Sequence, residues 1–101
     1  MNTQDISTPK SQEEFYSSLK EKLETHHNFP EDYLYKFIVP NNPEKLTEIY
    51  RVFDGIQHTM NNKESKNGNY TALSISAFVL DANMVIDIYQ KVAKVEGIVM
   101  L

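Results

Sequence analysis

The sequence predicts a small α+β domain with the element order helix, then β-α-β-β-α-β. Two stretches predict strands: residues 33–39 are aromatic and β-branched up to Pro40, and residues 70–80 alternate with a period of two. An Asn67-Gly68 pair just ahead of the second stretch is the strongest short hairpin signal. Because amphipathic helical stripes separate the strands, we expect a four-stranded antiparallel sheet under two helices, with an additional N-terminal helix.

Composition narrows the class of protein further. The chain has 101 residues, 41% of them hydrophobic and 24% charged, with a net charge of −4 and no cysteine. The missing cysteines exclude a disulfide scaffold, a thiolate metal site and a Cys nucleophile. The acidic balance disfavours a nucleic-acid or anionic-membrane binder. No signal peptide or apolar run of about 18 residues occurs, so we expect a cytoplasmic protein with no membrane segment.

The N-terminal region divides into an arm and a helix. Residues 1–10 are polar and predict a flexible arm, whereas residues 11–101 form a single domain. A capping box at residues 11–14 opens a helix of about residues 11–27, in which Phe15, Leu19 and Leu23 share one face.

The second helix follows the first strand directly. Asn42 is its expected N-cap and Pro43 its first residue, and Gly55 is a left-handed C-cap. Its apolar stripe consists of Leu46, Ile49, Tyr50 and Phe53.

The hairpin signal sets the register of the next two strands. A two-residue loop at positions 67–68 places Met60 opposite Ile75 and Ser65 opposite Tyr70. On the later strand Leu73, Ile75, Ala77 and Val79 then face the helices.

Asp81 caps the last helix, whose stripe reaches Val95 before Gly97 closes it. Residues 98–101 form a short last strand. This order of elements is the ferredoxin-like, split-βαβ two-layer sandwich, with an expected spatial strand order of 4-1-3-2.

Residues in three places resemble the YbeD-like family of small bacterial proteins of unknown function. They are Tyr35-Lys36 in the first strand, the hairpin with Ser65-Lys66, Gly68 and Tyr70, and residues 95–101. Asn67 departs from a tighter Ser-Lys-Gly turn, which affects only the turn geometry. The resemblance spans residues 13–101 and implies a ferredoxin-like fold similar to ACT regulatory domains and a bacterial, cytoplasmic setting. It implies no catalytic residues.

No combination of residues predicts a metal site or a cofactor. His26 and His27 are adjacent, so on a helix they point about 100° apart, and His58 lies far along the chain. The adjacent pair is better explained by its favourable interaction with the helix C-terminus.

Catalysis is not predicted either. Ser74 and Ser76 share a strand face but lack a nucleophile elbow, and the only arginine, Arg51, lies within a helix without a glycine loop. A small hydrolase therefore remains a minor alternative.

The outer sheet face, turned away from the helices, is the most informative feature. It carries a candidate interface made of Leu34, Ile38, Ala72, Ser74 and Phe78. A half-apolar face needs a cover: the N-terminal helix, a second copy in a homo-oligomer, or a partner protein. RNA binding is disfavoured because aliphatic Leu34 and Ile38 occupy positions where stacking rings are expected.

The hairpin gathers positive charge beside that face. The candidate anion or ligand site consists of Lys36, Lys63, Ser65, Lys66, Gly68 and Tyr70. The lysines have a structural explanation as well, since edge-strand lysines prevent aggregation.

The sequence as a whole favours a non-enzymatic regulatory or protein-interaction module that resembles ACT-type domains. A sensor of an anionic metabolite, using the Lys36, Lys63 and Lys66 region, is the alternative.

Overall fold

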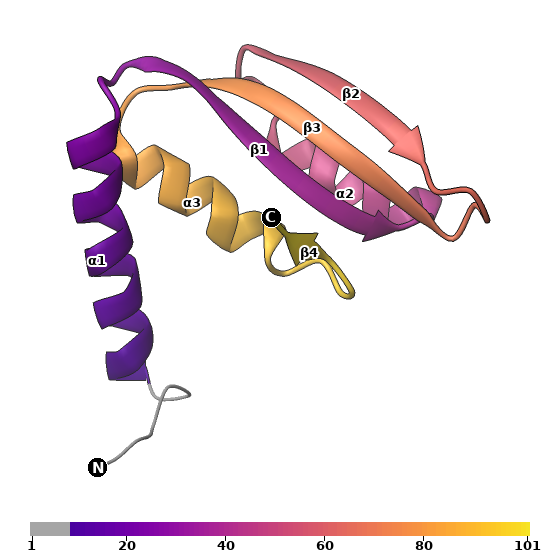
Figure 1. Cartoon of the computed structure of the whole chain (residues 1–101), viewed down its shortest axis with the longest axis horizontal. Helices are drawn as coiled ribbons and strands as arrows, with labels where there is room; N and C mark the ends of the chain where they lie inside the picture. The colour runs from indigo at the N-terminus through magenta and orange to yellow at the C-terminus, as the bar shows by residue number, and fades with distance from the viewer. Residues whose placement is uncertain (1–8) are drawn as a thin grey trace.

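The computed structural model describes residues 9–101, which form three helices and four strands (Figure 1). In chain order they are α1 (Pro9–His26), β1 (Glu31–Pro40), α2 (Pro43–Val52), β2 (His58–Glu64), β3 (Tyr70–Val79), α3 (Ala82–Val92) and β4 (Val99–Met100). None of the helices in this part of the chain is long and apolar enough to cross a membrane.

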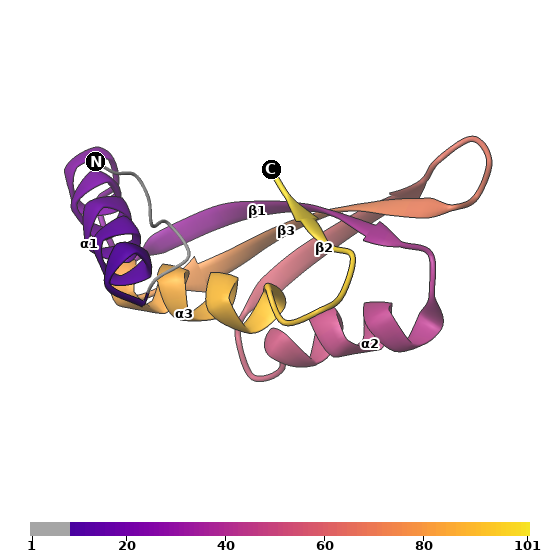
Figure 2. The ribbon, with the colours of Figure 1, turned by 90° about the horizontal axis from the view of Figure 1, so that it is seen from below.

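The strands form one antiparallel sheet in the order β2-β3-β1-β4. This is the predicted order 4-1-3-2 read from the opposite edge, so the α+β class and the strand order are confirmed. Figure 2 shows that α2 and α3 lie against one face of the sheet and leave the outer face open.

The predicted hairpin register is confirmed, because Met60 lies opposite Ile75. Burial alternates along β3 as expected: Leu73, Ile75, Ala77 and Val79 are buried between the sheet and the helices. Tyr35 and Phe37 of β1 are fully buried on the same side. The core therefore occupies the space between the sheet and its two helices.

The start of α2 follows the predicted local rules. Asn42 has an extended backbone, and its side chain accepts hydrogen bonds from the N–H groups of Glu44 and Lys45. Pro43 follows as the first helical residue, where its missing N–H costs nothing. Ile49 and Phe53 of the predicted stripe are fully buried.

Helix α1 stands across the end of the sheet and packs against α3 (Figures 1 and 2). Of its predicted stripe, Leu23 is buried, Leu19 is half-buried and Phe15 is 63% exposed. The interpretation that the N-terminal helix covers the outer face is therefore wrong: α1 packs against α3 instead, and Leu23 is the residue of its stripe that is buried.

Several predicted boundaries are displaced. Helix α1 begins at Pro9, so position 11 lies inside the helix and is not its N-cap. Of the predicted arm, residues 1–8 lie outside the described residues. Helix α3 ends at Val92 although Val95 is still buried, and β4 is shorter than expected, at Val99–Met100.

Candidate functional site

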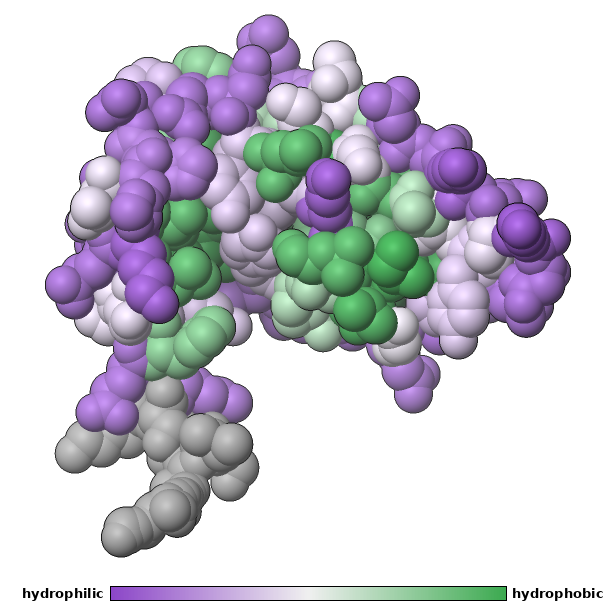
Figure 3. Space-filling view, viewed as in Figure 1, coloured by the Kyte–Doolittle hydropathy of each residue, from purple (hydrophilic) through white to green (hydrophobic). Residues whose placement is uncertain are grey.

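The outer face is a mixed apolar and basic surface. Leu34, Lys36 and Ile38 of β1 lie opposite Ser76, Ser74 and Ala72 of β3 and project to the same side. Leu34 is 54% exposed and Phe78 38% exposed. Figure 3 views the molecule from this side, where hydrophobic patches are interrupted by hydrophilic side chains.

Strand β4 adds to this surface a residue that the sequence analysis did not assign. Val99 lies opposite Ile38 in the sheet and is 51% exposed, so the two side chains extend one apolar patch across β1 and β4. The short last strand was predicted, but its register against β1 had no signal in the sequence.

The hairpin between β2 and β3 is anchored at the end of β1 by Asn41. The Asn41 side-chain N–H groups donate to the Gly68 carbonyl and to the Glu64 carboxylate, at 3.0 and 3.1 Å. Its side-chain oxygen accepts from the hydroxyl of buried Thr71, and its backbone N–H donates to the Asn69 carbonyl. The position of the hairpin thus depends on a residue that the sequence analysis left without a role.

The turn itself is longer than predicted. The Ser65 N–H donates to the Tyr70 carbonyl, and the Gly68 N–H donates to the Ser65 carbonyl, so four residues, 66–69, form the loop. The Asn67 side-chain oxygen accepts from the Ser65 hydroxyl and from the Asn69 N–H, which favours this wider turn. The register of β2 against β3 is unchanged, because the predicted two-residue loop and the observed four-residue loop have the same centre.

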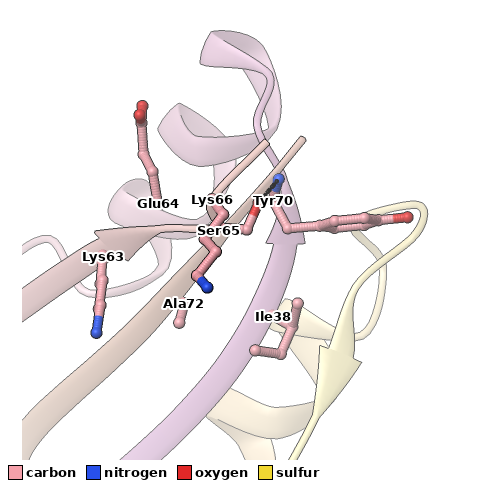
Figure 4. A pocket seen from close by; sticks show the side chains of 7 residues that line it. All are labelled: Ile38, Lys63, Glu64, Ser65, Lys66, Tyr70 and Ala72. Atoms are coloured by element: carbon pink, nitrogen blue, oxygen red, sulfur yellow. Dashed lines mark hydrogen bonds between the residues drawn. The ribbon is translucent and has the colours of Figure 1, made fainter. Parts of the chain in front are cut away.

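A hollow of about 500 Å³ lies between the hairpin and the outer face. Four residues of the predicted anion site line it: Lys63, Ser65, Lys66 and Tyr70. Ile38 and Ala72 of the predicted interface also line it, as does Glu64. In Figure 4 the amino groups of Lys63 and Lys66 lie on the same side as Ala72 and Ile38, that of Lys66 close to Ala72, whereas the Glu64 carboxylate projects to the opposite side.

The predicted anion site is therefore brought together only in part. Lys36 and Gly68 do not line the hollow, because Lys36 lies further along β1, opposite Ser74, and Gly68 belongs to the turn. The Ser65 hydroxyl already donates to Asn67 and accepts from the Tyr70 N–H. An anion in the hollow would thus depend mainly on the two ammonium groups.

Tyr33, Tyr35 and Tyr89 form a tyrosine cluster at the end of the sheet away from the hairpin, close to α1. The Tyr35 hydroxyl donates to the Val85 carbonyl, and the Tyr33 and Tyr89 hydroxyls are 3.0 Å apart. Burial raises the pKa of both Tyr35 and Tyr89 above the usual tyrosine range, so these hydroxyls stay protonated at neutral pH. In the structure they serve as hydrogen-bonding groups within the cluster.

The link between α1 and β1 is held by hydrogen bonds to the Glu31 carboxylate. Glu31 accepts from the His27 ring at 2.8 Å and from the Asn28 N–H at 3.0 Å. The hydrogen bond with His27, together with that from Asn28, holds the pKa of Glu31 below its usual value. This contact joins the end of α1 to the first residue of β1.

The histidines and serines considered in the sequence lie apart. His58 Nδ1 is 2.7 Å from the Ile56 carbonyl, and Ser74 and Ser76 lie on the outer side of β3. Among residues 12–101, whose side chains the structure describes, no hydrogen bond joins a serine to a histidine, and no group of three His, Asp or Glu side chains is placed to hold a metal ion.

These features define a small α+β domain with one open, apolar and basic sheet face. A family model described as a protein of unknown function, DUF493, matches residues 24–101, so the chain belongs to the DUF493 family. Comparison with curated proteins and with solved structures gave no match.

Proposed function

We propose that this protein is a non-enzymatic interaction module, regulatory in role, that binds a partner through the outer face of its sheet. The observation that carries the proposal is that α1 packs beside α3 and leaves Leu34 and Val99 exposed on the outer face, with half-buried Ile38 opposite Val99. Removal of such a patch from water provides the driving force for association.

The charges on this surface indicate the kind of partner. Lys36, Lys63 and Lys66 are all exposed on or beside the outer face, although the chain as a whole has a net charge of −4. A symmetric face-to-face dimer would bring together two surfaces that each carry these three lysines, which disfavours that arrangement. An acidic partner segment with apolar residues suits the surface better.

The finer structural and cellular assignments belong to the same proposal. The strand order and the pair of helices on one face support a ferredoxin-like arrangement similar to ACT domains. The resemblance to YbeD-like proteins supports a bacterial, cytoplasmic setting in which the domain acts without a cofactor.

Site-specific photo-crosslinking tests this proposal. A benzophenone amino acid in place of Phe78 should form a cross-linked adduct in cells, whereas the same group in place of Glu48, exposed on α2, should not. The adduct should disappear with Lys36→Glu, because an acidic partner is then repelled, and should weaken with added salt.

Two results would overturn the proposal. Equal cross-linking from positions 78 and 48 would show that the outer face is not selected. An adduct of twice the chain mass, together with a dimer in light scattering at micromolar concentration, would show that the face is occupied by a second copy instead.

The hollow beside the hairpin supports a second candidate function, the sensing of an anionic metabolite. Its two ammonium groups and its size suit a small phosphate or carboxylate compound. Saturation at 100 times the dissociation constant would add about 2.7 kcal/mol to the free energy of unfolding. A thermal-shift series with inorganic phosphate and citrate should therefore raise Tm, and Lys63→Ala or Lys66→Ala should remove the shift. Persistence of the shift in both variants would rule this function out.

A further inference from the structure

Strand β1 is paired along its whole length on one side only. Its ladder with β3 runs from Glu31 to Pro40. On the other side β4 pairs only with Phe37 and Ile38, and the Leu101 N–H adds one hydrogen bond to the Lys36 carbonyl. Within residues 9–101, no segment pairs with residues 31–35 on that side.

The alternation of an antiparallel ladder identifies the backbone groups at this open edge. The hydrogen bond from Leu101 shows that Lys36 directs its backbone groups toward β4. Every second residue does the same, so Leu34 and Asp32 direct their N–H and C=O groups to the open edge and not to β3. Such unpaired groups form a template for a further strand.

An apolar groove borders this edge. It has a volume of about 300 Å³ and lies between α1, which supplies Phe15 and Leu19, and the end of β4, which supplies Met100 and Leu101. Tyr16 of α1, Tyr33 of β1 and Tyr89 of α3 complete its lining. Figure 1 shows α1 and β4 on either side of α3, the three elements that line this groove together with β1.

The hydroxyls of Tyr33 and Tyr89 leave one hydrogen-bond donor free at the groove. One of the two hydroxyls donates to the other across 3.0 Å, so the proton of the accepting hydroxyl is left over. Among the described residues neither hydroxyl has another hydrogen-bond partner. An occupant can therefore place an apolar side chain between α1 and β4 and a carbonyl group at the tyrosines.

We propose that this groove binds an extended, apolar segment of a partner polypeptide, which adds to the open edge of β1 as a short strand between β4 and α1. The unpaired backbone groups select a peptide strand, and the lining residues select an apolar side chain. The free edge spans residues 31–35, roughly 17 Å at about 3.3 Å per residue, which suits a peptide of about five residues.

A second copy of the chain suits this groove poorly. Of the other free strand edges among the described residues, β4 is only two residues long, and β2, with the sequence HTMNNKE, is polar and almost wholly exposed. The proposal does not depend on the side chains of the outer face, because it uses backbone groups at an edge and a groove lined by α1, β1, α3 and the end of β4.

A random eight-residue phage-displayed peptide library is the probe. It should select peptides with apolar residues at alternate positions. Leu34→Pro removes the backbone N–H that the added strand needs, and it leaves every hydrogen bond between β1 and β3 in place. Leu34→Ala is the matched control, because it also removes the leucine side chain but keeps the N–H. The selected peptides should bind Leu34→Pro at least tenfold more weakly than Leu34→Ala.

A second pair of variants tests the groove. Phe15 lines it and is 63% exposed, and Leu80, equally exposed, lies elsewhere. Phe15→Asp should weaken peptide binding at least tenfold, and Leu80→Asp should leave it unchanged. Phe78→Lys should also leave it unchanged, which separates this site from the outer face.

Amide hydrogen exchange on the unmodified protein gives a test that does not require any variant to fold. The amides of Asp32 and Leu34 should exchange fast in the free protein and slow down with peptide, whereas those of Tyr33 and Tyr35 should be slow in both states. The proposal is overturned if no peptide is selected, if Leu34→Pro and Leu34→Ala bind equally, or if a dimer of the free protein already protects Leu34.

Discussion

Gly55 and Gly97 share a left-handed backbone but differ in what a side chain would contact. Their φ angles are +79° and +84°, in the region that L side chains rarely adopt. A Cβ at position 55 would have nothing within 4 Å, whereas one at position 97 would lie 2.9 Å from Cγ of Pro40. Gly97 thus serves both the turn before β4 and its close packing on the end of β1.

We therefore expect unequal losses of stability from the same substitution. Gly55→Ala should lower the free energy of unfolding by about 1 kcal/mol through backbone strain alone. Gly97→Ala should cost about 1 to 3 kcal/mol more, because the proline ring must move. Urea denaturation of the two variants measures the difference, and equal losses would contradict the close contact with Pro40.

Individual side chains also explain why the hairpin could be predicted only in part. Asn67-Gly68 correctly indicated the turn, and the register followed from its centre. The width of the loop depends on the Asn67 side chain, which accepts from both Ser65 and Asn69, and the support of the hairpin depends on Asn41. Contacts between residues 41 and 68 leave no local pattern in the sequence.

At the scale of single elements, local rules described α2 better than α1 or α3. Asn42 and Pro43 mark the start of α2 because a cap and a helix-compatible proline act within one turn. Helix α1 instead starts ahead of the predicted cap, and α3 stops before the predicted glycine. The end of α3 has no local signal: burial of Val95 continues the apolar stripe after the helix itself has ended.

The cap of α2 gives a direct test at this scale. Asn42→Ala leaves the N–H groups of Glu44 and Lys45 without their acceptor and should lower the free energy of unfolding by about 1 kcal/mol. Asn42→Asp keeps the acceptor and should retain most of the stability. Thermal denaturation of both variants shows whether stability depends on the side-chain acceptor or on the amide group in general. Similar losses of stability in the two variants would argue against capping.

At the scale of the whole molecule, the position of α1 decides which surfaces remain open. Only the last residues of α1 lie within the family match, which begins at residue 24. The helix is nevertheless part of the domain, because Leu23 is 5% exposed and packs in the core. By packing against α3 it leaves the outer face bare and forms one wall of the groove at the edge of β1.

Leu23→Ala should therefore destabilise the whole domain by about 2 to 4 kcal/mol in a single unfolding transition. Phe15→Ala, on the same helix but largely exposed, should change stability by less than about 0.5 kcal/mol. Chemical denaturation followed by circular dichroism measures both. A loss of helix signal without a change in the main transition would mean that α1 is not docked.

The sequence alone determined the class of fold, the strand order, the hairpin register and the inward face of β1 and β3. These follow from period-two alternation, turn residues and caps, all of which act over a few neighbouring residues. The tertiary structure alone decided where α1 packs, how little of β1 is covered by β4, and which lysines share the hollow. Those outcomes depend on contacts between residues far apart in the chain. Apolar surfaces of similar size compete for these contacts, and no short stretch of the sequence shows which of them is buried.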